Sequence, residues 1–132
     1  MGTIFQINKK RTLSLDQARA LLPIIRRITD ESSQEVKKVM TVLDAVRAKD
    51  KERAQELEEK INGIVTSWQN KVEKLGAEGK GLWLVDFDCG SGYYCWKYPE
   101  LELDHFHSYT EGFQARVKID ENITKVIDEN PN

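Results

Sequence analysis

Two histidines, His105 and His107, stand two positions apart in a segment predicted to be a strand. Because residues i and i+2 of a strand project to the same face, the pair forms, with the nearby Glu111 or Asp104, a candidate ligand set for a divalent transition metal. Leu101 and Leu103 share that predicted face, and a histidine on an apolar face is more often a hydrogen-bonded core residue. The sequence alone leaves both interpretations open.

Cys95 is a second candidate for chemistry, because a thiol beside His107 would form a nucleophile and its base. The competing interpretation is a buried, inert cysteine. The chain has two cysteines, Cys89 and Cys95, without the spacing of a zinc knuckle, and we expect both to be reduced. We assign no catalytic residue, and keep as an alternative function a metal-dependent or thiol-dependent enzyme around Cys95, His105, His107 and Glu111.

Polar residues also lie within stretches that are otherwise apolar. Arg26, Asp86 and Arg116 are expected either to pair with one another or to line an anion pocket. Trp96 belongs to an aromatic cluster that serves as core or as a stacking platform. Together with His107, which we expect to be a neutral imidazole hydrogen-bonded to Asp86, these residues form the predicted ligand-binding set: Arg26, Asp86, Trp96, His107 and Arg116.

Two long helices are predicted to position these residues. Ser14 and Gln17 form a capping box at the start of a helix over residues 14–47, and a second helix follows to about Leu75. Pro23 either kinks the first helix or divides it in two. Both helices repeat apolar residues at steps of three and four, the coiled-coil rhythm, which predicts an antiparallel helical hairpin over residues 13–75.

The composition changes after the glycine-rich residues 76–81. Nine of the eleven aromatic residues lie between Trp83 and Phe113, and residues 82–120 are predicted to form an aromatic β-unit. Strands are expected at 83–88, 93–98 and 101–107, with a fourth at 115–120 and a further edge pairing by Ile4, Phe5 and Ile7. The predicted fold is a single α+β domain over residues 1–132, in which the hairpin packs with an antiparallel meander of three to four strands.

Several short motifs occur in a fixed order along the chain. They are Leu21-Leu22-Pro23 with Arg26, then Val85-Asp86-Phe87, Cys95-Trp96, and His107 followed by Gly112-Phe113 and Arg116. In order and spacing the chain resembles the bacterial domain-of-unknown-function family 2203 over roughly residues 13–119. The resemblance implies the same architecture and carries no known activity. It includes His107 and does not include His105.

The charge balance argues against two classes of partner. Twenty basic and twenty-two acidic residues give a net charge of −2 and a pI near 5.8, so we expect neither nucleic acid nor membrane as partners, and a cytoplasmic location. Val36, Met40 and Val42 widen the apolar arc of the first helix beyond one partner helix, so either the β-unit or a second subunit must cover it, and we expect a homodimer. The expected function is an interaction or small-ligand-binding module, its site at the junction of β-unit and helices, with no cofactor identified.

Overall fold

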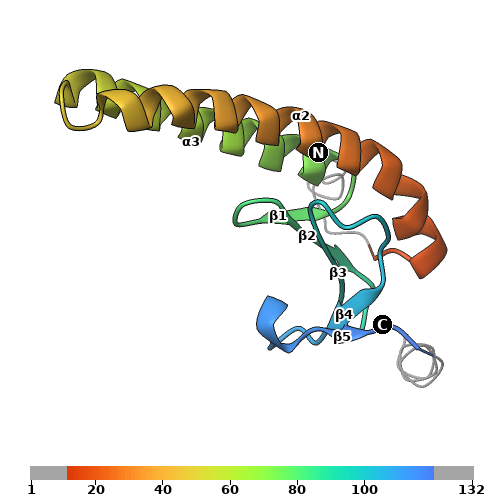
Figure 1. Cartoon of the computed structure of the whole chain (residues 1–132). Coiled ribbons are helices and arrows are strands. Elements are labelled where there is room, and N and C mark those ends of the chain that lie inside the picture. Colours follow the sequence, from red (N-terminus) through yellow and green to blue (C-terminus); the bar gives the residue numbers. More distant parts are fainter. Residues whose placement is uncertain (1–11, 121–132) are drawn as a thin grey trace, which may run out of the picture.

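The structure is a computed structural model and describes residues 12–120. Helices α2 (Leu15–Val46) and α3 (Lys51–Lys74) precede five strands and one short 3-10 helix. The strands are β1 (Glu78–Lys80), β2 (Leu84–Asp88), β3 (Tyr93–Lys97), β4 (His105–His107) and β5 (Val117–Lys118), and helix η1 (Phe113–Ala115) precedes β5. The α+β class and the helical hairpin are confirmed, and the sheet has five strands where three to four were predicted (Figure 1).

The ends of both helices follow from their capping residues. The Ser14 side chain accepts a hydrogen bond from the backbone of Gln17, whose side chain accepts one from Ser14, so the capping box is present. Asp50 caps α3 by accepting from the backbone of Arg53. Pro23 lies inside α2, which continues through it without a break. Figure 1 shows α2 bending toward the sheet over its first turns, the part that contains this proline.

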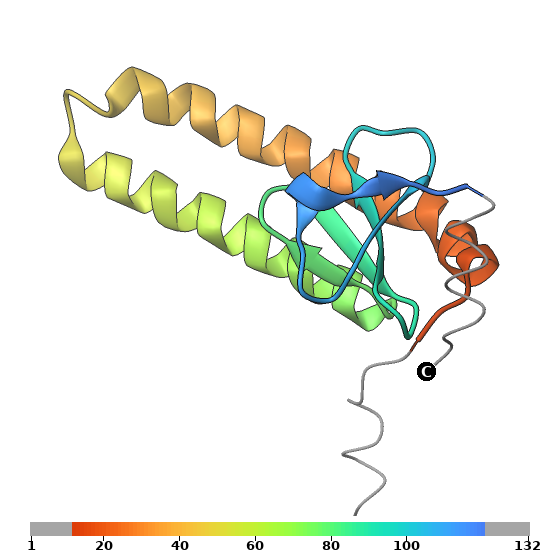
Figure 2. The same cartoon turned by 90° about the horizontal axis from the view of Figure 1, so that it is seen from below.

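The half of the hairpin distant from the sheet has its own small core. Val39 and Leu43 of α2 pack there with Ala54 and Leu57 of α3. These residues belong to the predicted three-and-four pattern, so the spacing correctly identified the contact face. Figures 1 and 2 show this end of the hairpin extending well beyond the β-unit.

A buried hydrogen-bond chain joins the two helices nearer the sheet. The indole Nε1 of Trp68 donates to Thr29 Oγ1 at 2.8 Å, and Thr29 Oγ1 donates to the carbonyl oxygen of Ile25 at 2.6 Å. All three residues are 0% exposed. Burial without a partner would be costly for the indole N–H, so Thr29 fixes how α3 packs on α2.

The five strands form an antiparallel meander in the order β1-β2-β3-β4-β5. The register places Val85 opposite Trp96 and Phe87 opposite Tyr94, and these four residues are at most 4% exposed. They pack with residues of both helices: Leu13, Ala18, Leu22, Ile25, Trp68 and Val72. One face of the sheet is therefore the main core, while the segment with η1 and β5 lies on the side away from the helices (Figure 2).

Strand β1 was not predicted, because its sequence, Glu78-Gly79-Lys80, lies in the glycine-rich segment expected to be a loop. A Cβ at Gly79 would lie 3.0 Å from the Trp68 ring and 3.2 Å from the Gln69 side chain. The absence of a side chain lets this edge strand pass close to α3. The glycine therefore permits a strand that alternation of apolar residues could not reveal.

Two predicted strands are shorter than expected. Residues 101–104 are not part of β4, and β5 covers two of the six residues predicted at 115–120. The predicted edge pairing by Ile4, Phe5 and Ile7 falls outside the described residues. Among residues 12–120, no helix has the length and apolar character required to span a membrane.

Candidate functional site

The face of the sheet away from the main core carries a row of polar residues. Because directly paired residues share a face, the register aligns Glu78, Asp86, Cys95 and His105 across strands β1 to β4. His107 lies on the same face, two residues after His105 and opposite Tyr93. The alternation predicted from sequence is therefore correct for the two histidines, but their face is the polar one.

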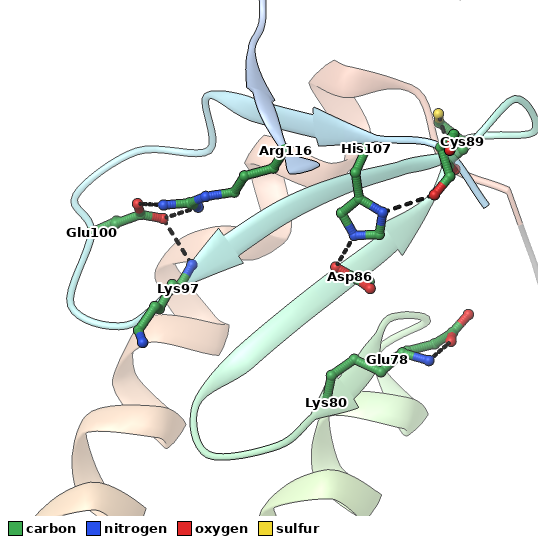
Figure 3. A network of polar contacts seen from close by, with 10 residues as sticks. Glu78, Lys80, Asp86, Cys89, Lys97, Glu100, His107 and Arg116 are labelled. Carbon is green, nitrogen blue, oxygen red and sulfur yellow. Dashed lines mark hydrogen bonds and ion pairs between the residues drawn. The ribbon is translucent and has the colours of Figure 1, made fainter. Parts of the chain in front are cut away.

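His107 is held between two oxygen atoms (Figure 3). Its Nε2 lies 3.1 Å from Asp86 Oδ1, and its Nδ1 lies 2.9 Å from the carbonyl oxygen of Ser108. The side chains of His107 and Asp86 are only 3% and 6% exposed. The predicted contact between His107 and Asp86 is thus present, and both ring nitrogens face acceptors.

Cys95 completes a compact group with this pair. One ligand atom from each of Asp86, Cys95 and His107 lies within 4.8 Å of the others, and Cys95 is 0% exposed. Burial, followed by the charge of Asp86, raises the pKa of Cys95 to about 12, although Arg116 acts in the opposite direction. A thiol with this pKa is a poor nucleophile near neutral pH, which argues against thiol catalysis by Cys95.

Arg116 borders the group on the side of Cys95 and pairs with Glu100. Its Nη1 and Nη2 donate to the two carboxylate oxygens of Glu100 at 3.0 and 2.6 Å (Figure 3). The guanidinium carbon lies 4.3 Å from the centre of the Phe113 ring, and Lys97 Nζ lies 5.2 Å from the same ring centre. Arg116 therefore pairs with Glu100 and not with Asp86, so the predicted Arg26–Asp86–Arg116 network is not formed.

Residues 108–116, which we call the return segment, pass over this polar face. Tyr109 donates to Asp88 at 2.6 Å and stacks edge-on against Tyr93, with ring centres 5.1 Å apart. The ring of Tyr93 in turn packs against the ring of His107, with ring centres 5.4 Å apart. The aromatic rings and the Arg116–Glu100 pair thus close the group from opposite sides, which explains why its polar atoms are buried.

The two other proposed metal ligands are not members of the group. Glu111 is exposed and accepts a hydrogen bond from Ser108 at 3.0 Å. His105 is paired opposite Cys95, and its Nδ1 is buried with no hydrogen-bond partner among the described residues. The predicted set of His105, His107 and Glu111 is therefore not assembled. Sequence reasoning had considered Asp86 and Cys95 separately and missed that they meet at His107.

Arg26 lies in a different place, on helix α2. It lines a cavity of about 430 Å³ between α2 and residues 101–104, the loop that precedes β4. The cavity is lined by Arg19, Leu22, Pro23, Arg26, Leu101, Glu102, Leu103 and Asp104. Arg19 is already engaged, since it contacts Asp104 at 3.1 Å and the Leu103 carbonyl at 3.2 Å. Among residues 12–120, Arg26 has neither a hydrogen bond nor an ion pair.

Trp96, the remaining residue of the predicted ligand-binding set, lies in the main core. It is 0% exposed, and its Nε1 donates to the carbonyl oxygen of Glu100 at 2.9 Å. A fully buried ring with its polar atom satisfied belongs to the packing of the domain. The structure therefore divides the predicted site into the cavity at Arg26, the polar group at His107, and a core residue.

A known family matches most of the chain. The profile of a family described as "Uncharacterized conserved protein (DUF2203)" matches residues 11–119, which is most of the chain. No curated protein and no solved structure matches the sequence.

Proposed function

The chain belongs to the DUF2203 family, whose description names no activity, and we propose from the geometry that it is a small-ligand-binding module. The binding site is the cavity between α2 and residues 101–104, at the junction of the helices and the β-unit. Its ligand is a small molecule with an apolar body and one carboxylate. The observation that carries the proposal is Arg26, which lines this cavity and makes no hydrogen bond or ion pair with the described residues.

The chemistry of the lining supports this ligand class. Leu22, Pro23 and Leu103 supply apolar surface, and a volume of about 430 Å³ lies within the range of roughly 300–1,000 Å³ common for small-molecule sites. Arg19 and Asp104 pair with each other, which leaves Arg26 and Glu102 as the other charged residues of the lining. Arg26 is therefore the cation that we assign to the ligand. A guanidinium presents two parallel donors that match the two oxygens of a carboxylate.

Binding of simple carboxylates tests the proposal. Phenylacetate and hexanoate would be titrated into the protein by calorimetry and by NMR, with phenylacetamide and hexanamide as uncharged controls. We expect the carboxylates to bind and the amides to bind about tenfold more weakly or not at all, since a hydrogen bond to a charged group contributes about 1.5–3 kcal/mol. Shifts of the backbone resonances of residues 101–104 would locate the ligand.

Neighbouring arginines on α2 provide a matched pair of variants. Arg26→Gln should lower carboxylate affinity about tenfold or more, whereas Arg27→Gln, at an exposed position of the same helix, should leave it unchanged. Equal affinities for the acid and the amide, or equal effects of the two substitutions, would refute the proposal.

A further inference from the structure

We propose that Asp86, Cys95 and His107 form a binding site for one divalent transition-metal ion, with zinc the best match. The site is distinct from the carboxylate cavity, since it lies on the polar face of the sheet beneath the return segment. Among the described residues, this is the one group of three or more histidine, cysteine, aspartate or glutamate side chains with ligand atoms close enough to share an ion.

The donor set suits zinc. Imidazole nitrogen, cysteine sulfur and carboxylate oxygen are its usual protein ligands, with bond lengths of about 2.0–2.3 Å. At these lengths a tetrahedral ion separates a nitrogen and an oxygen ligand by about 3.3 Å, and Nε2 of His107 lies 3.1 Å from Oδ1 of Asp86. The fourth position is left for a water molecule or for the second oxygen of Asp86.

The hydrogen bonds of His107 identify the nitrogen that would bind the ion. The Ser108 carbonyl can only accept, so Nδ1, 2.9 Å away, carries a proton and donates to it. In the neutral ring, Nε2 then has a lone pair, and it faces a carboxylate oxygen that also accepts. Two lone pairs facing each other in a buried site require either a shared proton or a cation between them. A backbone carbonyl bonded to the far ring nitrogen is also the common outer-shell partner of a metal-bound histidine.

The position of the group indicates a structural role for the ion. Asp86 is on β2, Cys95 on β3 and His107 on β4, so one ion would link three adjacent strands. All three residues are at most 4% exposed, which leaves little room for a substrate. Three protein ligands and one open position are the usual arrangement of a catalytic zinc site, so the structural role rests on the burial of all three ligands. In that role, metal binding would contribute directly to folding stability.

Metal analysis of the full chain, purified without a histidine tag under reducing conditions, tests the proposal. We expect about one zinc ion per chain. After removal of zinc, titration with Co²⁺ should saturate at one equivalent and produce a thiolate-to-cobalt charge-transfer band. Addition of zinc at a hundredfold excess over its Kd should raise the melting temperature of the metal-free protein by about 5–10 °C.

The chain supplies a matched control for two of the three ligands. Cys95→Ser should abolish the charge-transfer band, while Cys89→Ser should retain it. His107→Gln should weaken Co²⁺ binding by more than about 100-fold, since loss of an outer-shell partner alone costs about 10–100-fold, and His105→Gln should leave it unchanged. The metal content and the Co²⁺ titration of the wild-type chain test the proposal even where a variant fails to fold. A wild-type chain that purifies without metal and shows no band at excess Co²⁺ would overturn the proposal, as would a band that depends on Cys89 or His105.

Discussion

Replacement of Thr29 by valine isolates the buried hydrogen bond between α2 and α3. Valine keeps the shape of threonine but removes the hydroxyl that accepts from Trp68 Nε1 and donates to the Ile25 carbonyl. An unpartnered indole N–H in a fully buried position costs about 1–3 kcal/mol. The added methyl group returns at most about 0.8 kcal/mol of hydrophobic stabilisation. We therefore expect Thr29→Val to lower the free energy of unfolding by about 1–2 kcal/mol.

Replacement of Thr29 by serine is the matched control, because it keeps the hydroxyl and removes the methyl group. It should cost about 1 kcal/mol, mainly the transfer energy of one buried methyl group. The order of stability of the two variants shows whether apolar burial or the hydrogen bond contributes more at this position. If apolar burial dominated, valine would be the more stable variant, and if the hydrogen bond dominates, serine will be.

Urea unfolding followed by far-ultraviolet circular dichroism gives the free energies for both variants. The indole N–H proton of Trp68, followed by NMR, should also exchange with solvent faster in Thr29→Val than in Thr29→Ser. A valine variant at least as stable as wild type, with an indole proton exchanging at the wild-type rate, would show that the Thr29 hydroxyl is not important for packing α3 on α2.

Three further predictions concern the core, the ion pair beside the polar group, and assembly. Trp96→Ala should lower stability by about 3–5 kcal/mol, because the ring is 0% exposed; a chemical melt within error of wild type would contradict this. Burial opposes ionisation of Glu100, but the hydrogen bonds from Arg116 and from the Lys97 backbone outweigh it and lower its pKa below 4.5. The stabilisation by this carboxylate is therefore present above pH 4.5 and lost as the pH falls through the lowered pKa. Glu100→Gln should be less stable than wild type at pH 7, by about 1–2 kcal/mol, and equally stable at acid pH. A constant difference in stability at every pH would refute this prediction. We also expect a homodimer, since Met40 and Val42 remain 36% and 44% exposed on α2; light scattering at micromolar concentration should give twice the chain mass, and a monomer would disprove it.

The helices were predictable because their signals are local. Capping by Ser14 and Gln17, and apolar residues at steps of three and four, depend on neighbours within one or two turns. The same local information placed β2 and β3 within one residue of their observed ends. Continuity of α2 through Pro23 was not predictable, because a proline can either bend a helix or end it, and the local sequence fits both.

The candidate site was only partly predictable, because register between strands is not a local property. Alternation placed His105 and His107 on one face, and the contact between His107 and Asp86 was expected. Which residue of β3 stands opposite which residue of β2 and β4 depends on turn geometry and on burial of one whole face. For that reason the sequence did not show that Cys95 meets Asp86 and His107.

Only residues 105–107 of the strand predicted at 101–107 form a strand, and the first four residues do not, for a related reason. Their alternation of apolar and acidic residues is typical of a strand, yet Leu103 is buried by packing below α2. Its carbonyl oxygen accepts from Arg19 and not from a neighbouring strand. The side chain of Arg19 on α2 thus donates the hydrogen bond that a neighbouring strand would otherwise supply. A local sequence pattern cannot predict this contact, because the two residues are 84 positions apart.

The connectivity of the fold bears on the order in which it assembles. Each helix pairs with the next helix, and each strand pairs with the next strand, so the hairpin and the meander consist largely of contacts between segments near in sequence. Such contacts close small loops and form early, whereas distant contacts carry a larger entropic cost. Arg19 reaches Leu103 and Asp104 across 84 and 85 residues. The cavity at Arg26 is lined by the same two segments, so it exists only after these two distant parts of the chain have docked.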